Sequence, residues 1–483
     1  MLETTSRQGH PAASPDGANV RVGGEAARGR ARAAFPAIDL VTAGLAVAVS
    51  TLVATQLAIG GNRSLVILPL CAAGAALLAA LAYVRFEFFV FAVLALRPLI
   101  DMAQPAADTT NGPVGVSGMP AVALALMFMG ASTIWLAAQR RAGRLRSLST
   151  LSRAAIALVV ACGLSVPSSQ DKVASLGELA RVAAAFAMLV VLQQMIRTER
   201  IALRVLLACY VSAATPLVLA LYQAVTGGGA LTADGFSRVR GTFVHPNSLG
   251  IYLAFLIVMG AALYRHLTSR RRVILLVALT VCTAALVVTY SRGGWIATLL
   301  GLIVVGILQS RKLLLVVVVA ATTVLLCVPS VAARITDLGQ GRTFRGTAGN
   351  SLVWRIDYWG ETLSLVGSNP ITGIGLKETE FRLTSERAPH NDLVRMFVET
   401  GVIGLCAYLA FLTALIMGTV HTLRTTRRGI SRGMAVGFAG CLAAFMFESL
   451  GANLISQVVV LWYFFAFAAV AAAAGRFTPR AER

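Results

Sequence analysis

Long apolar runs recur along almost the whole of this 483-residue chain, and they decide what it can fold into. An α-helix needs about 20 predominantly apolar residues to cross the ~30 Å hydrocarbon layer of a bilayer. Only 13% of the residues are charged, against about 25% in a soluble domain. The alternating segments of ~10 residues that mark a membrane β-barrel are not visible. We therefore predict an all-α, polytopic transmembrane helix bundle.

The apolar runs predict about fourteen spans, with twelve or thirteen as alternatives because two of the runs are short. The predicted spans are 37–59, 65–84, 86–100, 119–138, 154–166, 175–196, 203–225, 248–264, 273–290, 295–310, 313–328, 399–420, 434–450 and 457–474.

Arginine and lysine set the orientation of these spans. They cluster in both terminal tails and in alternate short loops, at 140–153, 197–204, 265–272, 311–312 and 424–432. The positive-inside rule places such loops in the cytoplasm. Fourteen spans put every cluster on one side without conflict, and leave 101–118, 226–247, 291–294 and 329–398 on the other. The net charge of +21 therefore reflects membrane topology, and we expect no nucleic-acid partner.

These assignments divide the chain into six parts. Polar residues 1–35 are expected to form a disordered cytoplasmic tail without a signal peptide. The other parts are N-terminal transmembrane helices at 36–170, a transmembrane core at 171–328, an extracytoplasmic loop at 329–398, C-terminal transmembrane helices at 399–474 and a cytoplasmic tail at 475–483. Within the long loop, the apolar spacing from Ser351 to Val366 predicts a helix along the membrane surface or packed on the bundle.

Three short polar islands at the outer ends of apolar runs hold the candidate functional residues. The first contains Arg238, Arg240, His245 and Asn247. A guanidinium group pairs bidentately with phosphate oxygens, so these arginines suit an anionic substrate. The alternative is that they anchor a helix at the interface, with Asn247 as a helix cap.

The second island runs from Tyr290 to Gly294, between two spans. Gly293 and Gly294 suit a tight turn. Arg292 lies at the outer face, where the topology rule does not require a cation, and this favours a functional role.

The third island begins with His390 and Asn391, and Glu399 follows. A neutral imidazole near pH 7 can take a proton from a hydroxyl group, and Asp392 or Glu399 could orient it. The alternative is a hydrogen-bonded structural histidine. Further candidates are the ionisable residues that fall near predicted membrane ends: Glu178, Arg181, Arg355, Asp357, Asp101 and Glu448.

Other chemistries lack their motifs in this sequence. The seven cysteines all lie inside apolar runs, without the spacing of a zinc site, so we predict no metal and no cofactor. A Walker motif, a dinucleotide fingerprint, HExxH and DxD are absent, which argues against an ATP-driven pump and against a metal-dependent nucleotide-sugar transferase.

The ordered set of motifs resembles the O-antigen ligase/polymerase family, the membrane glycosyltransferases of bacterial surface polysaccharides. The matching features are Arg-x-Arg-Gly-Thr-Phe-x-x-Pro-Asn at 238–247, Ser-Arg-Gly at 291–293, Asn-Pro-x-x-Gly-x-Gly at 369–375, and the His-Asn and Glu-x-Gly pairs within 390–401. The resemblance covers roughly 170–450. Fourteen spans is a departure, since the ligases have about a dozen.

The resemblance implies transfer of glycan from undecaprenyl pyrophosphate to an acceptor hydroxyl, without metal or nucleotide sugar. Arg240 and Arg292 would hold the pyrophosphate and His390 would activate the acceptor. The further pyrophosphate candidates are Arg355, Arg238 and Arg181, and the supporting residues are Asn391, Glu399 and Asn247. His245 stays open as an alternative base.

The same resemblance implies a bacterial inner-membrane location, cytoplasmic termini and an extracytoplasmic active site. The partners would be the lipid-linked glycan, a glycan or lipid acceptor, membrane lipids, and polysaccharide export or chain-length proteins. We favour a polysaccharide polymerase over a ligase, because nothing in the sequence marks recognition of a lipid A core. A lipid-linked oligosaccharide flippase is the main alternative, but its charges would lie at mid-membrane depth, whereas here most lie at the ends of spans. A non-catalytic scaffold for export is a third reading.

Overall fold

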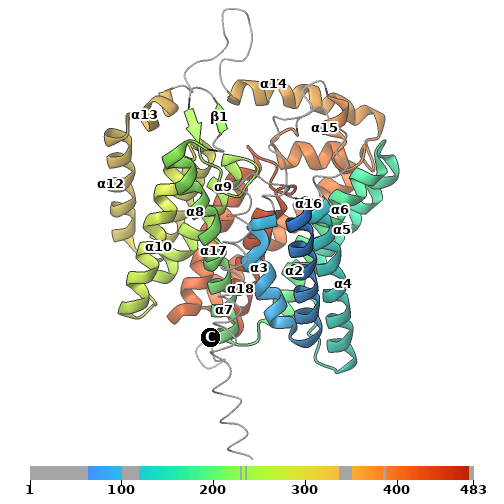
Figure 1. Cartoon of the computed structure of the whole chain (residues 1–483), viewed down its shortest axis with the longest axis horizontal. Helices are drawn as coiled ribbons and strands as arrows, with labels where there is room; N and C mark the ends of the chain where they lie inside the picture. The colour runs from blue at the N-terminus through green and yellow to red at the C-terminus, as the bar shows by residue number, and fades with distance from the viewer. Residues whose placement is uncertain are drawn as a thin grey trace, which may run out of the picture. The chain divides into compact units, whose positions relative to one another are not determined.

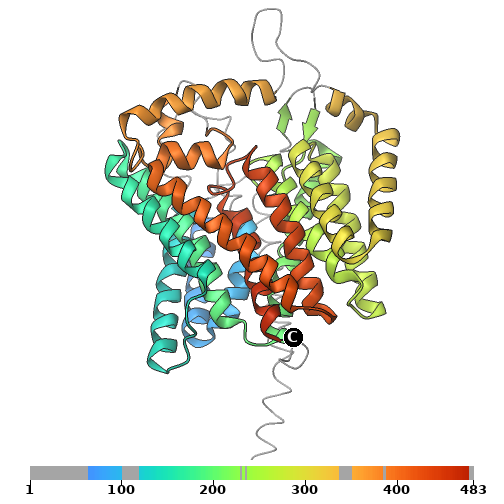
Figure 2. The same ribbon diagram turned by 180° about the vertical axis from the view of Figure 1, so that it is seen from behind.

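The computed structural model describes residues 64–100, 119–228, 231–233, 236–336, 351–383 and 388–477. The predicted span 37–59, the tail 1–35, Asp101 and the last six residues lie outside the described residues. Figures 1 and 2 show the described part as a bundle of helices.

Helices make up nearly all of the described chain, and one short antiparallel hairpin accompanies them. The elements are α2 (Ser64–Val84), α3 (Phe86–Ile100), α4 (Met119–Arg141), α5 (Thr150–Ser165), α6 (Lys172–Met195), α7 (Glu199–Val211), α8 (Ala214–Thr226), β1 (Leu231–Ala233), β2 (Phe236–Arg238), α9 (Pro246–Tyr264), α10 (Ser269–Val288), α11 (Arg292–Gln309), α12 (Arg311–Cys327), α13 (Pro329–Thr336), α14 (Ser351–Ser364), α15 (Thr379–Arg382), α16 (Asp392–Thr425), α17 (Gly429–Ser449) and α18 (Val458–Phe477).

Ten helical segments of the described chain are long and apolar enough to cross a membrane. The predicted all-α polytopic class is therefore confirmed, and a helix occupies every predicted span within the described residues. The predicted span 203–225 is two helices, α7 and α8, that break at Ser212 and Ala213. Because α3 and α12 have only 15 and 17 residues, the total of fourteen stays a prediction.

Helix α18 forms the centre of the described bundle. In its most hydrophobic 18-residue stretch, 89% of the residues are buried, whereas the corresponding share in the peripheral α10 is 22%. It packs against α6, α7, α9, α16 and α17. Its aromatic side chains fill the core: Phe464 stacks on Phe445 with ring centroids 4.2 Å apart, and Trp462 lies 4.9 Å from Phe128.

Helices α9, α11 and α17 approach one another closely through small residues. A Cβ atom at Gly440 would lie 2.7 Å from the Gly301 carbonyl oxygen, and one at Gly301 would meet the side chain of Val258. Where membrane helices meet at glycines, no side chain separates them, so their backbones can approach closely and gain dispersion energy. This packing fixes the start of α11 beside the end of α17.

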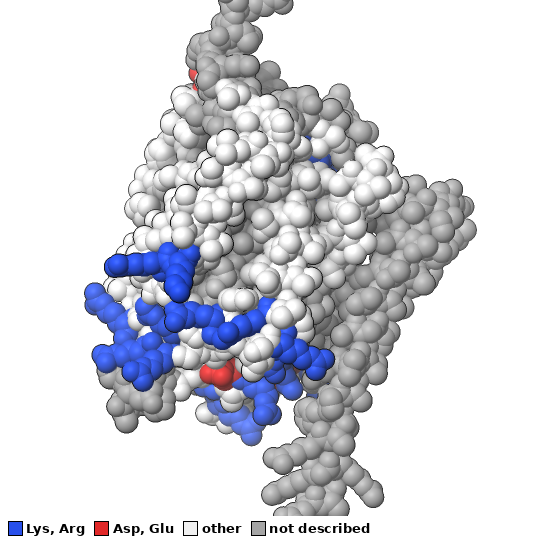
Figure 3. Space-filling model, turned by 90° about the vertical axis from the view of Figure 1, so that its left-hand side faces the viewer, with Lys and Arg blue, Asp and Glu red and all other residues white. Residues whose placement is uncertain are grey.

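The basic loops gather at one end of the bundle, as one face in Figure 3 shows. Arg146 and Arg476 both donate to the Ile196 carbonyl, which joins the α4–α5 and α6–α7 loops to the end of α18. Arg265 donates to the carbonyl of Gln309, which joins the ends of α9 and α11. We call this the basic end. The starts of α9, α11, α16 and α18 lie at the opposite end, together with the hairpin and α14.

Helix α14 confirms the helix predicted from Ser351 and lies across the opposite end of the bundle (Figures 1 and 2). Among the side chains described from Val353 to Ser364, Tyr358 and Thr362 are buried, whereas the apolar residues Ile356 and Leu363 are exposed. The helix therefore packs on the bundle through a face that holds both aromatic and polar residues, and some of its apolar side chains point away from the protein.

Helix α16 is interrupted at Gly401, where φ is 65° and a Cβ atom would meet the Ile371 carbonyl. Segment 370–375 lies in this break and replaces the lost helical hydrogen bonds. Ile374 and Gly375 donate to the carbonyls of Val398 and Glu399, at 3.1 and 3.0 Å. Val402 and Ile403 donate in return to the carbonyls of residues 370 and 371. An interrupted helix is tolerated at membrane depth only when its backbone is satisfied in this way.

Candidate functional site

The first polar island is tied directly to the second. Arg238 Nε donates to the Thr289 carbonyl at 2.9 Å, and its Nη2 donates to Asn247 Oδ1 at 2.7 Å. The Arg238 side chain is buried. It therefore joins β2, the end of α10 and the start of α9, and places the 238–247 segment beside Arg292.

Arg240 is held by its backbone on α8. The N–H groups of Arg240 and Gly241 both donate to Gln223 Oε1, at 2.9 and 2.8 Å. Gly241 has φ 56°, and a Cβ atom there would lie 2.7 Å from the Pro216 carbonyl. The half-buried Arg240 guanidinium also donates to the Val244 carbonyl at 3.4 Å.

His245 caps the start of α9. Its Nδ1 accepts from the Asn247 N–H at 3.1 Å, and its side chain is exposed. Pro246 follows at the first helical position, where its missing N–H costs no hydrogen bond. The side chain of Asn247 therefore accepts a hydrogen bond from Arg238. His245, and not Asn247 as predicted, caps the helix.

The Arg292–Arg355 cluster, made of Arg292, Arg355 and Glu448, joins three elements. Arg292 begins α11, Arg355 comes from α14, and Glu448 comes from the end of α17. The carboxylate of Glu448 packs against Gly293, where a Cβ atom would lie 2.5 Å from Oε1. Glu448 is buried, and its Oε1 makes no hydrogen bond within the described residues.

The pKa of Arg355 reflects its burial and its two charged neighbours. Burial lowers the pKa of Arg355, Glu448 opposes that effect, and the neighbouring charge of Arg292 adds to the lowering. Together these effects lower the pKa of Arg355. The negative charge of Glu448 therefore does not fully offset the cost of half-burying the charged Arg355 beside Arg292.

His390 lies at the start of α16, below α14. Its ring meets that of Trp354 edge-on, with centroids 6.1 Å apart. Its φ is 52°, a conformation uncommon for a residue other than glycine. The preceding carbonyl of Pro389 accepts from Trp359 Nε1 at 2.6 Å. Two aromatic residues of α14, the helix that carries Arg355, therefore hold the His390 segment.

Asn391 caps α16 by accepting from the N–H groups of Leu393 and Val394, at 2.9 and 3.2 Å. Its own N–H donates to Asn453 Oδ1 at 3.1 Å. Asp392 accepts from the Ile455 N–H at 3.2 Å. These bonds fix the turn between α17 and α18 beside His390, and sequence reasoning did not identify that turn.

Glu399 belongs to a second charged group, the Arg395 cluster, made of Arg395, Glu178, Glu399 and Glu380. Arg395 Nε donates to Glu399 at 2.9 Å, and its Nη2 lies 3.8 Å from Glu178 and 4.0 Å from Glu380. Glu399 also accepts from Thr379 Oγ1 at 2.5 Å. Arg395 was missed in the sequence, although its place within an apolar run, four residues before Glu399, was a usable signal.

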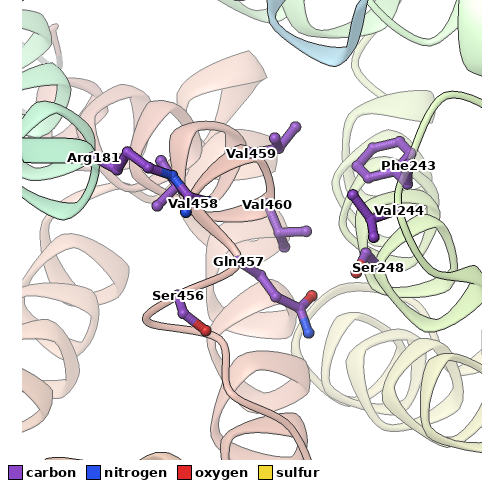
Figure 4. A pocket seen from close by; sticks show the side chains of 9 residues that line it. All are labelled: Arg181, Phe243, Val244, Ser248, Ser456, Gln457, Val458, Val459 and Val460. Atoms are coloured by element: carbon purple, nitrogen blue, oxygen red, sulfur yellow. The ribbon is translucent and has the colours of Figure 1, made fainter. Parts of the chain in front are cut away.

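Arg181 pairs with Glu178 at 2.9 Å and lines a pocket of about 190 Å³. Figure 4 shows Arg181 on one side of the start of α18 and the residues before and within α9 on the other. The lining residues are Arg181, Phe243, Val244, Ser248, Ser456, Gln457, Val458, Val459 and Val460.

The structure thus brings the predicted residues Arg238, Arg240, Arg292, Arg355 and His390 to the end opposite the basic loops. Asp357, on α14, is exposed. Within the described residues, no group of three His, Cys, Asp or Glu side chains could hold a metal ion.

A family model described as O-antigen ligase matches residues 277–412, from α10 into α16. The matched segment contains Arg292, Arg355 and His390, whereas Arg240 precedes it. No curated protein matches the chain. The match confirms the resemblance, and together with the apolar helices it supports O-antigen ligase/polymerase-type function in an integral membrane protein.

Proposed function

We propose that this chain, a member of the O-antigen ligase/polymerase family, transfers glycan from undecaprenyl pyrophosphate to an acceptor hydroxyl in surface-polysaccharide synthesis. The observation that carries the proposal is the position of Arg292 and Arg355 beside the His390 segment, at the end opposite the basic loops. With the basic loops in the cytoplasm of a bacterial inner membrane, this end faces outward.

The diphosphate of the donor binds to Arg292, Arg355 and Arg240. Guanidinium groups donate two parallel hydrogen bonds to phosphate oxygens, and they keep their charge in a poorly hydrated site. As the sugar leaves, negative charge grows on the departing diphosphate. Donors that are already in place stabilise this charge without reorganising, and loss of one such donor costs about 10²–10³ in rate.

His390 takes the proton from the acceptor hydroxyl. The hydroxyl oxygen then forms a bond to the anomeric carbon of the donor sugar, and the bond from that carbon to the diphosphate oxygen breaks. The diphosphate leaves with the bonding electrons. His245 is the weaker candidate base, because its Nδ1 already accepts the N–H of Asn247 at the start of α9.

The acceptor decides whether the enzyme is a polymerase or a ligase. We favour a polymerase, which would add the growing glycan to another lipid-linked repeat unit and work beside export or chain-length proteins. The lipid tail of the donor would lie along the exposed apolar surface of the outer helices, such as α10 and α12.

The test uses the full chain in lipid nanodiscs with a lipid-linked glycan and a second glycan as acceptor. We expect acceptor-dependent release of undecaprenyl pyrophosphate, and loss of that release in Arg292→Ala and His390→Ala. His421→Ala, an exposed histidine of α16 away from the site, is the matched control. Full activity in both site variants would refute the assignment. Movement of glycan lipid across the bilayer without a new glycosidic bond would favour a flippase.

A further inference from the structure

We propose that the pocket between α6, α9 and α18 binds one sugar ring of the transferred or accepting glycan through its hydroxyl groups. The inference rests on the proposed function, because it assigns a substrate group to the same end of the bundle. It also gives Arg181 a different ligand from the diphosphate that the sequence suggested.

The pocket walls carry one donor and one acceptor without hydrogen bonds. Arg181 Nε and Gln457 Oε1 are both buried, and neither has a hydrogen-bond partner within the described residues. A buried polar atom left unpaired costs about 1–3 kcal/mol, so such atoms point to a missing ligand or water. A hydroxyl group both donates and accepts, so the hydroxyls of a sugar ring suit a donor such as Arg181 Nε and an acceptor such as Gln457 Oε1.

The remaining lining is apolar, with small hydroxyls at its edges. Phe243, Val244 and Val458–Val460 offer aromatic and aliphatic surface, while Ser248 and Ser456 add hydroxyl groups. This mixture suits a ring that has C–H faces and polar edges. At about 190 Å³ the pocket is smaller than the ~300–1,000 Å³ typical of whole-ligand sites, so it would hold one part of a larger substrate.

Charge distinguishes this pocket from the Arg292–Arg355 cluster. The guanidinium of Arg181 is already paired with Glu178, at 2.9 Å. The pair is close to neutral, which favours an uncharged hydroxylated group over a diphosphate. Arg355, in contrast, has a lowered pKa beside a second guanidinium.

The turn between α17 and α18 connects the pocket to the proposed reaction site. Gly451 lies against Arg355, with a Cβ position 3.4 Å from Nη1. Two residues later Asn453 accepts from the backbone of Asn391, next to His390. Gln457, four residues further on, forms the pocket wall. One stretch of chain therefore contacts Arg355, holds the segment of His390 and lines the pocket.

The test is binding of lipid-free methyl glycosides of glucose, galactose, mannose, rhamnose and N-acetylglucosamine to the full chain in nanodiscs. Saturation-transfer NMR detects the binding, and titration gives dissociation constants. Because one hydrogen bond contributes about 0.5–1.5 kcal/mol, Gln457→Leu should weaken binding about threefold to tenfold. Ser248→Ala, on the opposite wall, should weaken it less.

Gln309→Leu is the matched control, because Gln309 also has a buried Oε1 without a partner but lies at the basic end. It should leave glycoside binding unchanged. No binding of any glycoside by the wild-type protein would overturn the proposal, and so would equal affinities of the Gln457 and Gln309 variants. Thermal unfolding midpoints check that each variant is folded.

This measurement separates the inference from the proposed function. Glycoside binding that depends on Gln457, in a protein without transfer activity, would sustain the pocket and refute the enzyme. With an active enzyme, an increased KM of Gln457→Leu for the lipid-linked donor would place the donor sugar here, and an increased KM for the acceptor would place the acceptor sugar. Unchanged values for both substrates would overturn the inference.

Discussion

Two groups of arginine and glutamate side chains lie at the same end of this bundle, and they differ in balance. In the Arg395 cluster the 3%-exposed side chain of Arg395 faces three carboxylates, and one of these, Glu178, also pairs with Arg181. In the Arg292–Arg355 cluster two guanidinium groups lie near one carboxylate, that of Glu448, and both arginines are half-buried. The guanidinium of Arg395 is buried, whereas both guanidinium groups of the Arg292–Arg355 cluster are partly exposed, and we call this second group the open cluster.

The difference indicates different tasks. The Arg395 cluster joins α6, α15 and α16, so it holds α15 on the membrane helices. Charges that are buried and mutually paired contribute to specific packing, and breaking such a group is costly. The Arg292–Arg355 cluster leaves a lowered pKa at Arg355, which an incoming anion would relieve. We therefore propose a structural task for the Arg395 cluster and anion binding for the Arg292–Arg355 cluster, and the following predictions test that difference.

The largest effect is expected for Arg395→Met. Removal of the guanidinium leaves Glu399 buried without its cation, whereas Glu178 keeps Arg181, and loss of one partner from a buried ion pair costs about 3–5 kcal/mol. The free energy of unfolding should fall by about that amount, measured as a lower thermal midpoint in detergent. Arg424→Met, an exposed arginine on the same helix, is the control. A midpoint equal to that of the control would remove the structural role of this cluster.

Arg292→Met should have the opposite signature. Its side chain begins α11 at the open cluster, so we expect about a 10²–10³-fold loss of transfer activity. The thermal midpoint should change little, because removing one of two neighbouring cations also removes repulsion. Arg311→Met, at the exposed start of α12, serves as the comparison for activity and stability. Loss of folding without a specific loss of activity would show that both clusters are structural.

Much of this architecture could be predicted from the sequence because its signals are local. Apolar runs predicted each described membrane helix, and the spacing from Ser351 predicted α14. The outward placement of Arg240, Arg292 and His390 followed from loop charges alone, and the contacts of Arg238 and Trp354 now bring their segments together. The chemical parts assigned to these residues remain predictions.

What could not be predicted depends on contacts between distant segments. The sequence marked 369–375 only as a motif, whereas its N–H groups fill the break at Gly401, and no periodicity marks such pairing. The buried face of α14 carries Tyr358 and Thr362 in place of the apolar stripe, because the helix crosses a polar end of the bundle. The partners of Glu448 and Gln457 depend likewise on how α17 and α18 pack.

Glu448→Gln sharpens the comparison by changing the balance of the open cluster. The amide has the same shape as the carboxylate that packs against Gly293. It lacks the negative charge, which raises the pKa of Arg355 and so opposes the lowering by burial. Affinity for inorganic pyrophosphate should increase severalfold, measured by calorimetry, and the thermal midpoint should fall slightly. Glu199→Gln, exposed at the basic end, should leave the affinity unchanged. Weaker pyrophosphate binding in Glu448→Gln would mean that Glu448 organises the site and does not compete with the anion.

The smallest effect is expected at Glu378, which directly precedes α15 and anchors it to the start of α6. Burial alone would raise the pKa of Glu378, but hydrogen bonds from Ser169, the Asp171 backbone and Arg382 together lower it. The bond from Ser169 Oγ is 2.5 Å long. A lowered folded-state pKa means that the ionised carboxylate stabilises the fold above the ordinary pKa of glutamate. This contribution is lost as the pH falls through the lowered value.

Acid should therefore release the contact between Glu378 and the start of α6 while the core persists. Hydrogen exchange at the Gln170 and Asp171 amides, which donate to Glu378 at 2.9 and 3.0 Å, should accelerate over that pH range after correction for intrinsic rates. Amides of α18 provide the internal reference. Glu378→Gln should show the faster exchange at every pH, without a step. The effect is local because the backbone bonds of Ile374 and Gly375 still hold the segment on α16. A pH step that persists in the variant would assign the titration to another carboxylate, of which Glu380 is the nearest in sequence.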